Sequence, residues 1–199
     1  MAAYTAPAGE SRAEIREKGS VFLAVIRPVA TEAEAKAALE GLAREYPDAT
    51  HHCWAWRLGD PAGPAARERS ADAGEPAGTA GVPILQVLRG AGLSDVLAVV
   101  VRWFGGVKLG KGGLARAYAG AAREALAALP VADRHTTVRV AFTVPYDRVG
   151  PVKRLIHPPE VELLEEEYGA AARLVLAVHE ERVGGLDEAL ANLGIEREH

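Results

Sequence analysis

Residues 102–120, RWFGGVKLGKGGLARAYAG, form a basic, glycine-dense stretch between two segments of different periodicity. The preceding residues 95–101 (DVLAVVV) are apolar and mostly β-branched, which is typical of a buried strand. The following residues 114–129 are rich in alanine, leucine and arginine and end before Pro130, which predicts a helix. The stretch is therefore expected to be a loop that leads from a strand into the N-terminus of a helix.

The charges of this stretch have one sign. No acidic residue lies between Asp95 and Glu124, whereas five basic residues do. The unpaired N–H groups and the positive dipole end of a helix N-terminus also favour an anion. The expected phosphate-binding or nucleic-acid-binding residues are Arg102, Lys108, Gly110, Lys111, Gly112, Gly113 and Arg116.

The glycines also fit two other interpretations. Glycine is also used where the backbone needs a positive φ or where two elements pack closely, and the lysines would then be ordinary solvated charges. The spacing of Gly105, Gly110 and Lys111 resembles a nucleotide-phosphate loop, but Gly112 stands where a Ser or Thr would bind magnesium. A triphosphate hydrolase of that type is therefore not expected.

Composition limits the class of protein. The chain has 199 residues, 49% of them hydrophobic, which is enough for a substantial core. Cys53 is its one cysteine, so neither an internal disulfide nor a four-cysteine zinc site is expected. There is no run of 18 apolar residues and no signal-peptide pattern at the N-terminus. We expect a cytoplasmic protein without membrane contact or a disulfide-linked partner.

Net charge is unevenly distributed. Residues 1–136 carry 16 basic and 15 acidic side chains, and residues 137–199 carry 7 and 12, within a total net charge of −4. A protein that binds nucleic acid over its whole surface would be more basic. Any such contact is therefore expected in the N-terminal part.

The N-terminal part shows a mixed pattern of strands and helices. Residues 21–29 are expected to form a strand that ends at Pro28, and residues 51–58 (HHCWAWRL) alternate as a second strand. Residues 31–46 are expected to form a helix that begins with a capping box of Thr31 and Glu34. Residues 59–81 have no periodicity and are expected to be a long loop, with a solvated excursion at 61–69. A short helix is expected at 82–89.

The C-terminal part has the order of a ferredoxin-like domain. After a polar connector at residues 131–136, a strand at 137–144, a helix at 146–156, strands at 161–168 and 171–178 and a helix at 185–193 are expected. The last strand of that fold would be short or absent near Ile195. The expected domains are residues 1–132 and 133–199.

No catalytic residue, metal site or cofactor is expected. Asp72 and Glu75 could act as an acid and a base, but a glutamate in a glycine loop more often caps a turn or pairs with a cation such as Arg102. His51 and His52 face opposite sides of one strand and cannot easily bind one metal ion. Cys53 would need a histidine distant in the sequence to act as a nucleophile.

The aromatic residues divide into two groups. Trp54 and Trp56 alternate within a strand and are expected in the core. Trp103 and Phe104 directly precede the basic glycine stretch, where exposed rings could stack on bases.

Three blocks of sequence, HHCWAW, DAGEPAGTAGVPIL and VVVRWFGGVKLGKGGLARAYAG, resemble the signature of the IMPACT family, and its two-domain bacterial branch in particular. The resemblance implies an α+β protein with an N-terminal domain of the ribosomal protein S5 domain 2-like type and a ferredoxin-like C-terminal domain. It assigns no catalytic role. Besides residues already named as expected phosphate or nucleic-acid ligands, the residues that match the family signature are His51, Glu75, Gly78, Thr79, Gly81, Gly105, Gly106, Leu114 and Tyr118.

The resemblance also implies a role in translation, because eukaryotic members regulate translation in the starvation response through a protein partner. The first hypothesis is a translation-associated regulatory protein that binds RNA or the ribosome through the basic stretch. The second is a protein-interaction module that regulates a translation or stress factor. The third is an enzyme for a small phosphorylated substrate, with Glu75 as the base and Lys111 as the phosphate ligand.

Overall fold

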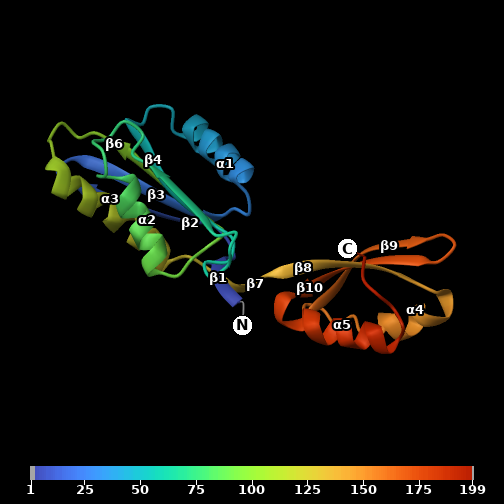
Figure 1. Ribbon diagram of the computed structural model, residues 1–199. Coiled ribbons are helices and arrows are strands. Elements are labelled where there is room, and N and C mark those ends of the chain that lie inside the picture. The colour runs from blue at the N-terminus through green and yellow to red at the C-terminus, as the bar shows by residue number, and fades with distance from the viewer. Residues whose placement is uncertain (1–2, 199) are drawn as a thin grey trace. The chain divides into compact units, whose positions relative to one another are not determined.

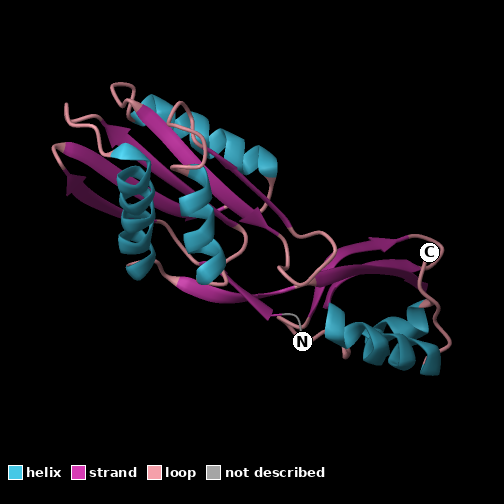
Figure 2. Cartoon of the chain, turned by 60° about the vertical axis from the view of Figure 1, so that its left-hand side comes forward, coloured by secondary structure: helices cyan, strands magenta, loops and turns pink. Residues whose placement is uncertain are grey.

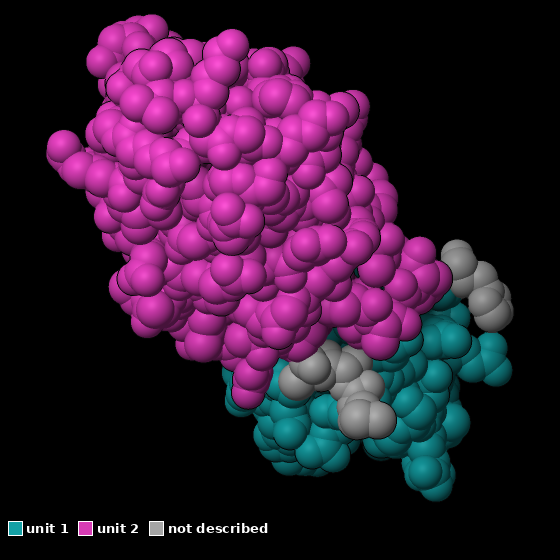
Figure 3. Space-filling model, turned by 90° about the vertical axis from the view of Figure 1, so that its left-hand side faces the viewer, with its two compact units in different colours: residues 1–3, 135–199 teal, residues 4–134 magenta. Residues whose placement is uncertain are grey.

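The computed structural model describes residues 3–198, which divide into two compact units (Figure 3). Tyr4–Arg134 form the N-terminal unit, and the C-terminal unit begins at His135. Each unit has its own hydrophobic core. No helix among residues 3–198 is long and apolar enough to cross a membrane.

The N-terminal unit is built on an antiparallel sheet of five strands in the order β2-β3-β6-β4-β5 (Figure 1). The central strand β6 is buried from Val96 to Arg102, which explains its unbroken apolar run. The strands are β2 (Ser11–Glu17), β3 (Ser20–Pro28), β4 (His51–Leu58), β5 (Arg67–Ala71) and β6 (Val96–Trp103).

Helices cover both faces of this sheet. The helix α1 (Glu32–Glu45) packs on one face against Trp56, and α2 (Gly81–Gly90) and α3 (Gly110–Ala127) pack on the other against Cys53 (Figure 1). The alternation predicted for β4 is thus confirmed, since its tryptophans lie on the α1 face.

The start of α1 is also as predicted. The backbone N–H of Glu34 donates to Thr31 Oγ1 at 3.1 Å, and the Glu34 carboxylate accepts a hydrogen bond from the Ala30 N–H at 2.8 Å. The capping box therefore fixes the first turn of the helix, although the returning bond goes to Ala30 rather than to Thr31.

Two predictions of irregular structure are wrong. Residues 59–81 were expected to form a loop, but residues 67–71 within it form the edge strand β5. Residues 131–136 were expected to form a connector, but they contain the strand β7 (Val131–His135). β7 pairs with β1 (Ala3–Pro7) in a separate two-stranded sheet, and the expected domain boundary falls within β7. Every residue of β7 is exposed, and β5 is exposed or half-buried. Such strands have no buried face, so hydrophobic periodicity cannot reveal them.

The helix α3 begins at Gly110, four residues before its expected start at residue 114. Gly112 and Gly113 therefore lie in its first turn, not in a loop. Glycine disfavours helix, which is why the sequence pattern places the start too late. Packing of Leu114 and Tyr118 in the core stabilises this turn in spite of its glycines.

The C-terminal unit has a three-stranded antiparallel sheet in the order β8-β10-β9, with both helices on one face (Figure 2). A single bridge between Phe142 and Arg197 stands where the fourth strand of a ferredoxin-like fold would pair, which confirms the expected truncated strand. The elements are β8 (Thr137–Val144), α4 (Tyr146–Lys153), β9 (Val161–Tyr168), β10 (Ala172–His179), η1 (Glu180–Arg182) and α5 (Val183–Asn192).

Candidate functional site

A buried carboxylate lies among the elements that carry the sequence blocks. The side chain of Glu75 is 4% exposed and accepts hydrogen bonds from the Arg102 guanidinium and, at 2.8 Å, from the Tyr118 hydroxyl. His51 Nε2 lies 3.9 Å from the same carboxylate oxygen. These residues come from the loop before α2, from β6, α3 and β4, so the cluster joins four separate segments.

Arg102 is held on several sides. Its Nη2 donates to Ser20 Oγ at 3.3 Å, and the same hydroxyl oxygen accepts the N–H of Gly105 at 3.1 Å. Its guanidinium carbon lies 5.3 Å from the ring centroid of Phe22 and 5.5 Å from that of Phe104, as in cation–π pairs. Arg102 therefore ties β6 to β3 and to the Glu75 loop.

Arg102 was expected to bind phosphate, and its position argues against that role. It is 5% exposed and forms an ion pair with Glu75, whereas a phosphate ligand must face solvent. The structure instead contains the pairing of Glu75 with a neighbouring cation, which the sequence offered as the alternative to a catalytic role for Glu75.

Asp72 organises the loop that carries Glu75. Its carboxylate accepts the N–H groups of Gly78 at 2.8 Å and of Ala80 and Gly81 at 2.9 Å. Burial acts to raise the pKa of Asp72, but these backbone hydrogen bonds together hold it below its ordinary value. Asp72 thus anchors the entry to α2, and Thr79, which donates to the Pro76 carbonyl at 2.6 Å, tightens the same turn.

Replacing Asp72 with asparagine should destabilise the N-terminal unit by about 1 to 2 kcal/mol at neutral pH, because a carboxylate accepts these bonds better than an amide. Because the pKa of Asp72 is lower in the folded than in the unfolded protein, its carboxylate stabilises the fold at a pH above the unfolded pKa of about 3.9. This stabilisation is lost as the pH falls through the folded pKa. The difference between the proteins should therefore shrink below about pH 4. Urea unfolding followed by tryptophan fluorescence measures it. Asp133→Asn, at an exposed position of β7, is the control, and a difference that persists unchanged at pH 3 would contradict the assignment.

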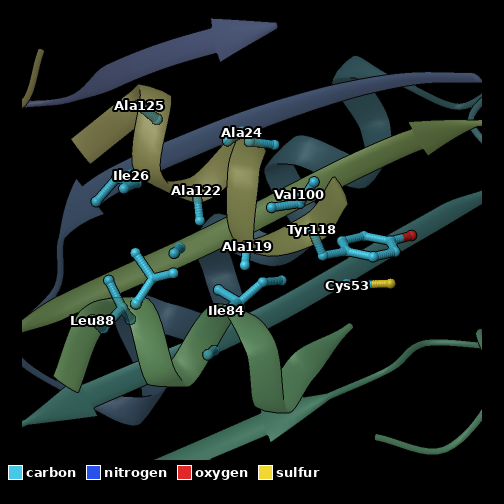
Figure 4. Close-up of a cluster of buried hydrophobic side chains, with 14 of the residues drawn as sticks. Ala24, Ile26, Cys53, Ile84, Leu88, Val100, Tyr118, Ala119, Ala122 and Ala125 are labelled. Atoms are coloured by element: carbon cyan, nitrogen blue, oxygen red, sulfur yellow. The ribbon is translucent and has the colours of Figure 1, made fainter. Parts of the chain in front are cut away.

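Cys53 is not a nucleophile in this structure. It is fully buried, donates to the Asp72 carbonyl at 2.9 Å, and burial raises its pKa to about 12. The hydroxyl of Tyr118 lies beside the Cys53 thiol (Figure 4), and burial also raises the pKa of Tyr118. Both groups stay protonated near neutral pH and serve as hydrogen-bond donors within the fold.

Four basic side chains face solvent around the start of α3. Lys108, Lys111 and Arg116 are exposed, as phosphate ligands must be. Lys18, which was not expected there, is brought in by the turn between β2 and β3, and it lines a hollow of about 310 Å³ together with Arg116. We refer to Lys18, Lys108, Lys111 and Arg116 as the basic surface.

Lys18 could not have been found from the spacing of charges, since it lies far from the glycine stretch in the sequence. It reaches the basic surface because Gly19 and Gly105 touch backbone to backbone: a Cβ on Gly105 would lie 1.9 Å from the Gly19 carbonyl carbon. A local signal was Gly19, because a glycine between two strands is typical of a turn and has a φ of +81° here.

The two aromatic residues before the glycines have different surroundings. Trp103 is half-buried, donates through Nε1 to Asp48 at 3.0 Å and packs edge-on against Tyr46 with 5.6 Å between ring centroids. Phe104 is 48% exposed and lies over the Arg102 guanidinium. Only Phe104 of the two offers a free ring face for stacking.

These observations define a two-domain α+β protein whose N-terminal unit has an exposed basic surface and a buried glutamate–arginine–tyrosine cluster. Its N-terminal residues 18–126 match the Impact N-terminal domain, and residues 142–194 match a domain of unknown function, DUF1949. The chain belongs to the IMPACT family. The fold class expected from the resemblance, S5 domain 2-like followed by ferredoxin-like, is confirmed.

Relatives align over most of the chain. An IMPACT family member of Thermus thermophilus is 43% identical over 83% of this chain and 88% of its own length. The IMPACT family member YigZ of Escherichia coli is 32% identical over 96% and 94%. A crystal structure of a hypothetical protein, 30% identical, covers 99% of this chain and 97% of its own with a TM-score of 0.79.

Proposed function

We propose that this protein is a translation-associated regulator that binds RNA, including the RNA of the ribosome, through the basic surface. The observation that carries the proposal is the exposure of Lys18, Lys108, Lys111 and Arg116 around the start of α3. Lys18 and Arg116 line one hollow, and Lys108 and Lys111 are exposed in the segment that enters α3. Exposed basic side chains that lie close together are the electrostatic footprint of a site for a phosphate backbone.

The backbone at the start of α3 supports the same ligand. Leu109 precedes the helix and provides no side-chain hydrogen bond to the first turn. The first N–H groups of an α-helix lack intrahelical partners and carry the positive end of the helix dipole, and in α3 the side chain of Leu109 does not cap them. Gly112 and Gly113 have no side chain that would keep a phosphate away from these groups.

Phe104 adds a surface for a base. Its ring is half-exposed beside the basic surface, and Arg102 lies beneath its other side. A ring held in this way is suited to stack on an unpaired base, so we infer that the ligand is single-stranded or has flipped-out bases.

A protein partner is the second candidate. Phe104 and Val107, in the segment before α3, are 48% and 50% exposed, and exposed apolar side chains are typical of protein interfaces. A translation or stress factor would bind there with little dependence on salt.

The enzyme hypothesis has less support. Glu75, its required base, is 4% exposed and accepts hydrogen bonds from Arg102 and Tyr118. A general base must reach its substrate, and this carboxylate is enclosed by its own protein.

Ribosome and RNA co-sedimentation tests the proposal. We expect the wild-type protein to bind at low salt, with a slope of log affinity against log salt near −3 if about four phosphates of a single strand are contacted. The Lys108→Ala, Lys111→Ala variant should lose about half of that slope and most of the binding.

The matched control is Lys36→Ala, Arg44→Ala, which removes the same charge from exposed positions of α1, on the other face of the sheet. It should bind like the wild type. Equal loss in both variants, or binding that does not change with salt, would count against an RNA surface here and favour the protein partner.

A further inference from the structure

Two histidines and a glutamate meet in the C-terminal unit. His135 ends β7, His179 ends β10, and Glu181 lies in η1, which follows β10 directly. Each offers one ligand atom, and these three atoms all lie within 4.8 Å of one another. No metal site was expected from the sequence.

His179 has an unmet hydrogen-bonding requirement. It is 7% exposed, and its Nδ1 is buried without a hydrogen-bond partner among the described residues. Its ring stacks on that of His135, with 4.3 Å between centroids and 8° between planes. A buried ring nitrogen without a partner is uncommon in a folded protein, so this group needs an explanation.

The backbone around these side chains is fixed. The N–H of His179 donates to the Glu160 carbonyl, and the N–H of Glu180 donates to the Thr136 carbonyl, each at 2.9 Å. Arg182, the nearest cation in the sequence, forms an ion pair with Glu160 at 2.7 Å and so has its own carboxylate partner. The strand ends that carry the two histidines are thereby held together.

We propose that His135, His179 and Glu181 bind a divalent transition-metal ion of the kind that prefers imidazole, with Zn²⁺ as the representative. Two imidazole nitrogens and a carboxylate are a ligand set for zinc, and hard ions such as Ca²⁺ and Mg²⁺ prefer oxygen ligands. A fourth position is left for water.

Binding requires a small movement of exposed side chains. Zinc–nitrogen bonds of about 2.0 to 2.1 Å place tetrahedral ligand atoms roughly 3.3 Å apart. His135 is exposed, so a change of its side-chain torsions can bring its ligand atom closer to that of the buried His179. The ion would then connect the β7–β8 junction to the end of β10.

The test is a titration of the chelator-treated, full-length chain with Zn²⁺, measured by calorimetry, and with Co²⁺, measured by its visible absorption. We expect one ion per chain, and about 100-fold weaker binding by His135→Ala, because even the loss of a hydrogen-bond partner of a ligand costs about 10- to 100-fold. Glu181→Gln should weaken binding as well.

The control is His157→Ala, which removes another exposed histidine of the same unit outside the cluster. It should bind zinc like the wild type. Both histidine variants alter exposed positions, so circular dichroism should show them folded. The proposal is overturned if wild type and His135→Ala bind zinc equally, or if His157→Ala loses binding to the same degree.

Discussion

Replacing Arg102 with methionine should destabilise the N-terminal unit by about 3 to 5 kcal/mol, because the Glu75 carboxylate would remain buried without its cation. The ion pair is enclosed, with side chains 6% and 4% exposed, so water cannot take the place of the guanidinium. Tyr118 would remain as a donor to Glu75, but one neutral hydroxyl cannot balance a buried charge.

Denaturant unfolding followed by tryptophan fluorescence measures this loss in the N-terminal unit alone, since Trp54, Trp56 and Trp103, the three tryptophans of the chain, all lie there. The Arg102→Met, Glu75→Gln double variant should recover a large part of the loss, because it leaves no unpaired charge.

Lys111→Met, a similar change at an exposed position of the same stretch, should alter stability by less than about 0.5 kcal/mol. If Arg102→Met changes the free energy of unfolding as little as Lys111→Met does, then Arg102 is not a structural residue. A role for Arg102 as a phosphate ligand would then have to be considered again.

Gly105→Ala should destabilise the N-terminal unit by about 3 kcal/mol or more, beyond the usual cost of overpacking. A Cβ at this position would lie 1.9 Å from the Gly19 carbonyl carbon and 2.3 Å from the Ser20 nitrogen. Both are backbone atoms, so no change of rotamer relieves the clash, and the β2–β3 turn must move away from β6.

Two neighbouring glycines provide matched controls for the same unfolding experiment. Gly106 has open space around its Cβ position but a φ of +86°, so Gly106→Ala should cost only about 1 to 2 kcal/mol. Gly112 lies in the first turn of α3 without a positive φ, and Gly112→Ala should stabilise by up to about 1 kcal/mol. An equal effect of all three substitutions would show that the contact with Gly19 does not constrain Gly105.

Elements with a buried face could be predicted from the sequence. β4, β8 and β9 have the bounds that their patterns indicate, and α1 begins at its capping box. Burial on one side imposes a period of two or 3.6 residues, and that period is readable in the chain. β5 and β7 lack a buried face, so their existence depends on a partner strand that the local sequence does not reveal.

The candidate site was predictable only in part. Lys108, Lys111 and Arg116 were found because they are neighbours in the sequence and share one sign of charge. Lys18 was not expected near this stretch, and Arg102 was expected to face solvent although its side chain is buried against Glu75, because both positions depend on which segments touch.

Four features of the protein follow from its amino-acid sequence: the family, the two-domain order, the buried faces of the main elements and the basic character of the α3 start. These are properties of local periodicity, capping and charge, which neighbouring residues specify. The tertiary structure alone decided that Glu75 takes Arg102 out of solvent, that Gly19 brings Lys18 to the basic surface, and that His135 lies against His179. Each of these contacts joins residues far apart in the chain, and such a contact is set by how the sheets and helices pack rather than by sequence spacing.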